Sequence, residues 1–162
     1  AASDTLATLI QPLAKRAEAT ATLQNRPWHH PSSWPAWCSE PAGDGSLAEI
    51  VANLLENAFR YSPNGCAIGL ELLEDGLCVW DGGPPIPKPE QERIFQQGER
   101  GSSAEERPGT GLGLALARRL AERNGGQLVL STEPHSIHPA LPSTGNAFRL
   151  SWSRAALPAA EA

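Results

Sequence analysis

The amino-acid sequence predicts a two-layer α/β fold, and two observations lead to this class. Three segments place apolar side chains at helical spacing, and four shorter apolar runs bounded by turn residues have the length of strands. The chain of 162 residues is long enough to bury one core, and its 40% hydrophobic and 19% charged residues are ordinary for a globular domain. Helices packed on one sheet accommodate both kinds of segment in a single domain.

The first predicted helix spans residues 3 to about 22. Ser3 is a candidate cap at its start, and Pro12 is expected to kink the helix because an interior proline lacks an N–H group. The apolar positions that recur at helical spacing are Leu6, Leu9, Ile10, Leu13 and Ala17.

Residues 25–43 are rich in proline and tryptophan. They predict either short edge strands or an irregular cover over the core, with the tryptophans used for packing. The pair His29-His30 fits two strand residues at this edge better than a metal site.

A second helix, capped by Asp44 or Ser46, is predicted to run to about Tyr61, and Ser62-Pro63-Asn64-Gly65 ends it. Its apolar stripe consists of Leu47, Ile50, Val51, Leu54, Leu55 and Ala58.

The next two runs, 66–73 and 77–80, are joined by Glu74-Asp75-Gly76 and predict a β-hairpin. The remaining predicted elements are a short helix over 90–97, a polar stretch over 98–108, a helix over 111–124 closed by two glycines, strands over 127–132 and 146–152, and a disordered tail over 155–162.

Composition narrows the functional classes. No apolar stretch is long enough to span a bilayer and no signal peptide is visible, so we expect a cytoplasmic domain, with membrane attachment of the parent protein left open. The net charge of −5 disfavours nucleic acid as the main partner. Three cysteines without CxxC spacing predict reduced thiols. Because the chain contains no methionine, we expect it to be a piece of a larger protein.

Two carboxamides lie on one face of the second predicted helix. Asn53 and Asn57 are four residues apart, and Arg60 and Tyr61 extend their face by another turn. An amide oxygen is a suitable ligand for Mg²⁺, and Arg60 can donate to phosphate. The alternative is a polar helix face that meets water.

Two glycine-containing turns complete the pattern. Asp81 ends an apolar run before Gly82-Gly83, so its carboxylate could accept from an exocyclic amine such as that of adenine; the alternative is an ordinary strand-ending turn. Gly109-Thr110-Gly111-Leu112-Gly113 opens a helix and would expose backbone N–H groups to an anion. No Lys-Ser/Thr follows, which excludes a Walker P-loop.

In order and spacing, these motifs resemble the ATP-binding catalytic domain of bacterial sensor histidine kinases, within the gyrase and histidine-kinase ATPase superfamily. Residues 53–62 resemble the N box, Asp81-Gly82-Gly83 the first glycine box, Ile94-Phe95 the F box and 109–114 the second glycine box. The resemblance covers about residues 44–152. It implies a Bergerat-type two-layer sandwich, with a mixed sheet covered on one face by about three helices.

The resemblance also implies roles. Asn57 would bind Mg²⁺, Asn53 would help to hold phosphates and metal, and Arg60 would contact phosphate. Residues 96–108 would form a lid over ATP, with Arg100 as a γ-phosphate contact. The implied nucleotide-binding positions are Asn57, Tyr61, Asp81, Gly83, Ile86, Arg100, Gly109, Thr110, Gly111, Leu112 and Gly113.

Two positions depart from related patterns. Members of the superfamily that hydrolyse ATP place a glutamate base four residues before the metal-binding asparagine, and this chain has Asn53 there. That difference favours phosphoryl transfer to a histidine over hydrolysis. Pro85 replaces the last glycine of the first glycine box, which removes a backbone donor and restricts φ.

The implied function is transfer of the γ-phosphoryl group of ATP to a histidine in an upstream dimerisation domain, as part of a two-component system with a response regulator. The four histidines of this chain lack the acidic flank of such an acceptor. Residues 1–25 would be the tail of the dimerisation domain or a linker, 26–154 the catalytic domain and 155–162 a tail. The whole protein would be a homodimer and this piece a monomer. The alternatives are a Ser/Thr kinase of anti-sigma type and a degenerate partner-binding module.

Overall fold

The computed structural model describes residues 4–96 and 113–152, which form one five-stranded sheet with helices on one face. The strands lie in the order β1-β2-β3-β5-β4, and only the β1–β2 pair is parallel. Their bounds are β1 Trp28–His29, β2 Ile68–Leu73, β3 Gly76–Asp81, β4 Gln127–Ser131 and β5 Asn146–Ser151. The predicted α/β sandwich with a mixed sheet is confirmed.

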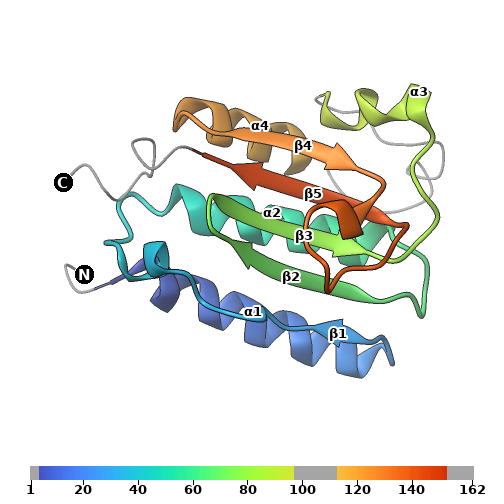
Figure 1. The fold of residues 1–162 in the computed structure, drawn as a ribbon, viewed down its shortest axis with the longest axis horizontal. Helices are drawn as coiled ribbons and strands as arrows, with labels where there is room; N and C mark the ends of the chain where they lie inside the picture. Colours follow the sequence, from blue (N-terminus) through green and yellow to red (C-terminus); the bar gives the residue numbers. More distant parts are fainter. Residues whose placement is uncertain (1–3, 97–112, 153–162) are drawn as a thin grey trace.

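Three helices form the second layer, and Figure 1 shows them side by side behind the sheet. They are α1 Leu6–Leu23, α2 Ser46–Tyr61 and α4 Gly113–Arg123. The short α3, Lys88–Gln91, and a 3₁₀ turn at Arg93–Phe95 together occupy the segment predicted as one helix over 90–97. None of the helices within 4–96 and 113–152 combines the length and apolarity needed to cross a bilayer.

The two helix starts differ from the predictions. The N-cap of α1 is Thr5, whose hydroxyl accepts from the Thr8 N–H in a capping box; the predicted cap, Ser3, lies outside the described residues. The N-cap of α2 is Gly45 in the left-handed region, with φ of 83°. Asp44 Oδ1 accepts from the Ser46 N–H at 3.0 Å, so Asp44 acts one position before the cap. Ser46 is already helical.

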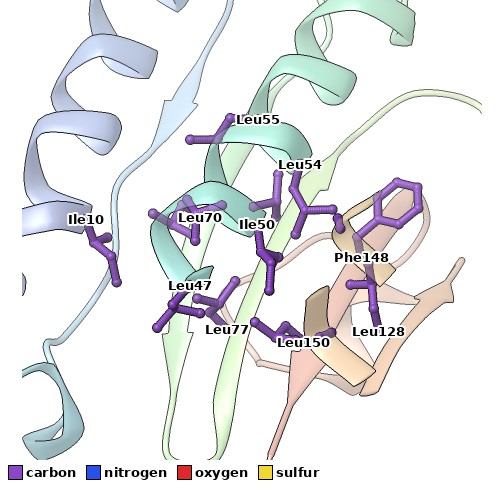
Figure 2. Close-up of a cluster of buried hydrophobic side chains, with 14 of the residues drawn as sticks. Ile10, Leu47, Ile50, Leu54, Leu55, Leu70, Leu77, Leu128, Phe148 and Leu150 are labelled. Carbon is purple, nitrogen blue, oxygen red and sulfur yellow. The ribbon is translucent and has the colours of Figure 1, made fainter. Parts of the chain in front are cut away.

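The main core lies between the helices and the sheet. Figure 2 shows Leu54 of α2 and Phe148 of β5 among the side chains that meet there. Ile10 and Ala14 of α1 are fully buried in the same cluster, so α1 is packed as part of this folded unit. Pro12 lies on the exposed side of α1, which continues through it.

The opposite face of the sheet carries a smaller cluster covered by the segment between β4 and β5. Its buried members are Leu73, Cys78, Trp80, Leu141 and Ala147. Glu71 is fully buried on β2 and accepts from both the backbone N–H and the hydroxyl of Ser32, while His29 Nε2 lies 2.6 Å from its Oε1.

Residues 25–43 contain both of the structures that the sequence left open. The two-residue strand β1 is followed by an irregular segment with a 3₁₀ turn at Ala36–Ser39. Trp37 is buried, packs edge-on against Trp152 and donates its indole N–H to the Leu73 carbonyl at 2.6 Å. The three cysteines are free thiols, as predicted. Burial raises the pKa of Cys38 to about 11 and that of Cys78 to about 12.

Candidate functional site

The predicted site residues within the described chain include residues of three elements, α2, β3 and α4. Asn53 and Asn57 lie on α2, Asp81 ends β3, and Gly113 begins α4. A Cβ atom added at Gly113 would lie 3.9 Å from Asn53 Oδ1, so the fold brings the asparagine face of α2 to the start of α4. Asn53 and Gly113 are 60 positions apart in the sequence, and packing of α4 against α2 brings them together.

The two asparagines carry buried polar atoms without partners. Asn53 Nδ2 and Asn57 Oδ1 are buried, and neither has a hydrogen-bond partner among the described residues. Leaving such an atom unsatisfied costs about 1–3 kcal/mol. The two atoms have complementary chemistry, because Asn53 offers a donor that suits a phosphate oxygen and Asn57 offers an oxygen that suits a hard cation. The alternative of a polar face that simply meets water does not explain these buried atoms.

Asp81 is a buried carboxylate at the end of β3, with 6% of its surface exposed. Its Oδ1 accepts from the Gly83 N–H at 2.8 Å and from Asn146 Nδ2 at 3.3 Å. Burial raises the pKa of Asp81, and the two hydrogen bonds oppose that rise. Because both bonds go to Oδ1, Oδ2 is the oxygen left to accept from a ligand.

Asn146 is a functional candidate that the sequence analysis missed. It is buried at the start of β5, directly opposite Asp81 in the strand register. Its amide donates to Asp81 and to the Pro84 carbonyl at 2.9 Å, and its Oδ1 accepts from the Ile86 N–H at 2.8 Å. Asn146 thus orients the carboxylate and holds the turn after it. In the sequence it is one polar residue at a strand end, with no motif to mark it.

Two glycines allow this close packing. A Cβ atom at Gly83 would lie 2.8 Å from Pro63 Cδ and 3.0 Å from Asp81 Oδ1. Gly145 has φ of 153°, and a Cβ there would lie 2.4 Å from the Asp81 carbonyl oxygen. Pro85 is exposed, between the Pro84 carbonyl and the Ile86 N–H that Asn146 binds.

Arg60 and Tyr61 are half-buried at the end of α2. Arg60 Nη2 donates to Glu56 Oε2 at 2.8 Å, and both side chains line a groove of about 420 Å³ between α1 and α2. The Glu56 side chain is exposed.

The Ile94-Phe95 segment is anchored in the core. Both residues are buried, and Phe95 packs edge-on against Phe148 with ring centres 5.9 Å apart. The Arg118 guanidinium of α4 lies 4.4 Å from the centre of the Phe95 ring and donates to Glu92 at 2.6 Å. These contacts join the end of the 88–96 segment to α4.

Five predicted site residues, Arg100, Gly109, Thr110, Gly111 and Leu112, lie outside the described residues. Across 4–96 and 113–152, no group of three histidine, cysteine, aspartate or glutamate side chains could hold a metal. A hard cation at this site would therefore rely on amide oxygen, ligand oxygens and water, as Mg²⁺ commonly does beside phosphates.

The chain matches the family profile described as histidine kinase-, DNA gyrase B-, and HSP90-like ATPase over residues 43–155. It is 37% identical over 153 residues to the sensor histidine kinase Hik2 of Thermosynechococcus vestitus, which covers 90% of this chain and 37% of that protein. It is 38% identical over 96 residues to the sensor protein KdpD of Escherichia coli K12, which covers 56% of this chain and 11% of KdpD. The chain thus spans well under half the length of these curated relatives.

Solved structures agree with these relatives. The mycobacterial sensor histidine kinase MprB superposes with a TM-score of 0.62 at 27% identity, covering 87% of this chain and 93% of that one. The catalytic domain of histidine kinase ThkA has a TM-score of 0.64 at 20% identity, covering 93% and 94%. At that identity, ThkA shows the fold alone. These neighbours favour neither an anti-sigma kinase nor a degenerate module.

Proposed function

Because the chain belongs to the histidine kinase-, DNA gyrase B- and HSP90-like ATPase family and is closely related to catalytic domains of sensor histidine kinases, we propose that it binds ATP with Mg²⁺ and delivers the γ-phosphoryl group to a histidine. That histidine lies in a dimerisation domain upstream in the same protein. The response regulator then receives the group. The whole protein is a homodimer, and this catalytic piece is a monomer.

The observation that carries the proposal is the pair of partnerless buried atoms, Asn53 Nδ2 and Asn57 Oδ1, with Asn53 beside the start of α4. They supply a donor and an acceptor where phosphates and a cation would meet. We assign Asn57 Oδ1 to the cation, Asn53 to the phosphates and Arg60 to a phosphate oxygen. Bound Mg²⁺ would neutralise charge that develops on the β- and γ-phosphates.

Asp81 recognises the adenine base. Its Oδ2 accepts from the amine of adenine, while Gly83 lets the backbone approach the flat ring. Guanine carries a carbonyl at the corresponding position, and two acceptors would then face each other. The fixed carboxylate therefore selects adenine. Tyr61, Ile86 and Gly113 complete the nucleotide contacts within the described chain.

The chemical step needs no nucleophile from this chain. The lone pair of an imidazole nitrogen attacks the γ-phosphorus, the bond to the β–γ bridging oxygen breaks, and ADP leaves with that electron pair. The chain holds and orients the triphosphate. Water does not attack in place of the histidine, because Asn53 has no basicity with which to activate it. Its dependence on ATP leads us to propose a cytoplasmic location.

The test uses this chain together with a dimerisation domain that contains the acceptor histidine. We expect micromolar to millimolar binding of ATP and ADP by calorimetry, strengthened by Mg²⁺. Asn57→Ala should abolish transfer of labelled phosphate and leave the far-ultraviolet circular dichroism unchanged, because the buried stripe of α2 consists of its leucines, Ile50, Val51 and Ala58.

Gln11→Ala, an amide-to-alanine change on the exposed side of α1, is the matched control and should transfer at the native rate. Transfer by Asn57→Ala at the native rate would remove Asn57 from the metal site. No heat and no thermal shift with millimolar nucleotide would favour the degenerate module.

A further inference from the structure

Arg26 is a buried cation outside the motifs discussed so far. It lies in the turn between α1 and β1, with only 5% of its surface exposed. Arginine is almost never buried to this extent without a partner that needs its charge or its planar set of donors. Among the described residues Arg26 forms no ion pair, so its role has to be found in its hydrogen bonds.

The guanidinium connects three separate parts of the chain. Its Nε donates to the Cys66 carbonyl at 2.9 Å, its Nη2 donates to the Ser62 hydroxyl, and its Nη1 donates to Gln24 Oε1 at 3.2 Å. It also lies over the Phe59 ring, 5.5 Å from the ring centre. Arg26 therefore holds the last turn of α2 and both ends of the 62–66 loop in one arrangement.

Residues 62–67, which include that loop, pack against the turn that follows Asp81. Pro63 is the residue that a side chain at Gly83 would meet, and the Ala67 carbonyl accepts from the Gly82 N–H at 2.9 Å. A shift of the 62–67 segment would therefore move Gly82 and Gly83, and with them the Gly83 N–H that holds Asp81 Oδ1. The positive charge of Arg26 also favours the ionised form of Asp81.

We propose that Arg26 is a positioning residue for base recognition: by fixing the 62–67 loop against Gly82 and Gly83, it holds the Asp81 carboxylate where it discriminates adenine from guanine. This inference rests on the proposed nucleotide site. It assigns to Arg26 an effect on base selectivity, which a purely structural residue would not have. Loss of folded protein lowers the affinity for ADP and GDP by the same factor and leaves their ratio unchanged.

The experiment measures the dissociation constants of ADP and GDP, with Mg²⁺, by calorimetry on the folded chain. The native chain should prefer ADP. In Arg26→Met the preference should fall about three- to tenfold, mainly through weaker ADP binding. Arg26→Lys keeps the charge but loses the planar fork, so its ADP preference should lie between those of the native chain and Arg26→Met. Arg16→Met removes an exposed arginine from α1 and should leave the ratio unchanged.

Ser62→Ala is a milder variant that removes one acceptor of the guanidinium, and it carries the test if Arg26→Met does not fold. Its ADP preference should fall about two- to fivefold. A folded Arg26→Met, or in its place Ser62→Ala, with the native ratio would overturn the role of Arg26 and leave the proposed function intact. A native chain that binds neither nucleotide would overturn both.

Discussion

At the scale of single residues, the site is built from polar groups that cost stability in the free chain. Asn53 Nδ2 and Asn57 Oδ1 are buried without partners, and Asp81 is a carboxylate whose pKa burial raises. A domain selected for folding alone would rarely keep such groups buried. Two of them lie within α2 and one ends β3, and we infer that ligand binding, and not folding, accounts for these side chains.

Asp81→Asn should separate the contribution of the carboxylate to nucleotide binding from its cost to stability. The amide can still accept from Gly83 and Asn146 through its oxygen, but it presents a donor to the adenine amine, so adenine nucleotides should bind about 1–3 kcal/mol more weakly. The free variant should melt higher than the native chain, because the desolvated charge is gone. Calorimetry with ADP and thermal melting check the two halves. Equal binding of ATP and GTP by the native chain would remove Asp81 from base recognition.

The stability effect of Asp81 has a defined pH dependence. Because its pKa is raised above the ordinary 3.8, the folded chain holds this proton more strongly than the unfolded chain between the two values. The native chain should therefore lose stability relative to Asp81→Asn as pH rises from about 4 through the raised pKa, and the difference should then stay constant. Melting curves over this range measure it.

The pKa of Glu71, on the other face of the sheet, is shifted in the opposite direction from that of Asp81. Burial raises the pKa of Glu71, but the bonds from His29 and Ser32 outweigh burial and hold the pKa below its ordinary 4.5. Its stabilisation is present above 4.5 and is lost as pH falls through the lowered pKa. Glu71→Gln should lower the free energy of unfolding at pH 7 by about 1–3 kcal/mol, and the difference should narrow in acid.

Denaturant unfolding at neutral and acid pH provides the measurement for Glu71→Gln. Glu74→Gln, an exposed change in the hairpin turn, is the control and should stay within about 0.5 kcal/mol of the native chain. A constant difference at all pH values would mean that the Glu71 charge does not contribute.

At the scale of elements, α1 and α2 show how packing overrides local preference. Pro12 lies in the interior of α1, yet the helix continues because Leu6, Ile10, Ala14 and Ala17 are buried in the core on the opposite side. The hydrophobic contribution of four buried side chains exceeds the cost of one proline. In α2, burial of the apolar stripe likewise leaves Asn53 beside the start of α4.

Replacement of Pro12 by alanine tests this account of α1. The variant regains a backbone donor on an exposed helix face, so the free energy of unfolding should rise by about 1–3 kcal/mol. Gln11→Ala, on the neighbouring exposed position, should change it by less than about 0.5 kcal/mol. Urea unfolding compares the two. An unchanged or lower stability would show that the surroundings of Pro12 depend on its ring.

At the scale of the whole molecule, the chain carries the proposed nucleotide site, but its histidines lack the setting of a phosphoacceptor. Its four histidines are all described, and none lies on an α-helix: His29 is in β1, His30 follows it, and His135 and His138 lie between β4 and β5. The position of a hydrolytic base is occupied by Asn53. We therefore expect the γ-phosphate of bound ATP to meet neither an activated water nor an acceptor histidine among the described residues.

The isolated chain should accordingly show little ATP hydrolysis and no self-phosphorylation. Addition of a dimerisation domain with its histidine should restore transfer in trans, slowly, because separation of the two parts lowers their effective concentration. Phosphate release and labelled-protein assays measure the two reactions. Steady turnover near about one per second by the chain alone would point to a hydrolytic member of the family, with a base other than Asn53.

The sequence by itself determined the order of elements, the family and the candidate site, because these depend on local periodicity and on short motifs. The stripe of α2, the hairpin of β2 and β3, and the four-residue spacing of Asn53 and Asn57 are each contained in fewer than twenty consecutive residues. The predicted caps Asp44 and Ser46 were wrong because the left-handed conformation of Gly45 shifts the helix start by one residue.

Only the tertiary structure decided the roles that depend on contacts across the chain. Asn146 meets Asp81 through strand register over 65 positions, and Arg26 meets Ser62 and Cys66 because the β1 edge returns to the end of α2. Neither residue belongs to a motif, since its partners are set by the three-dimensional packing and not by neighbours in sequence. The sequence shows the residue types of Asn146 and Arg26, but their contacts form only after the chain has folded.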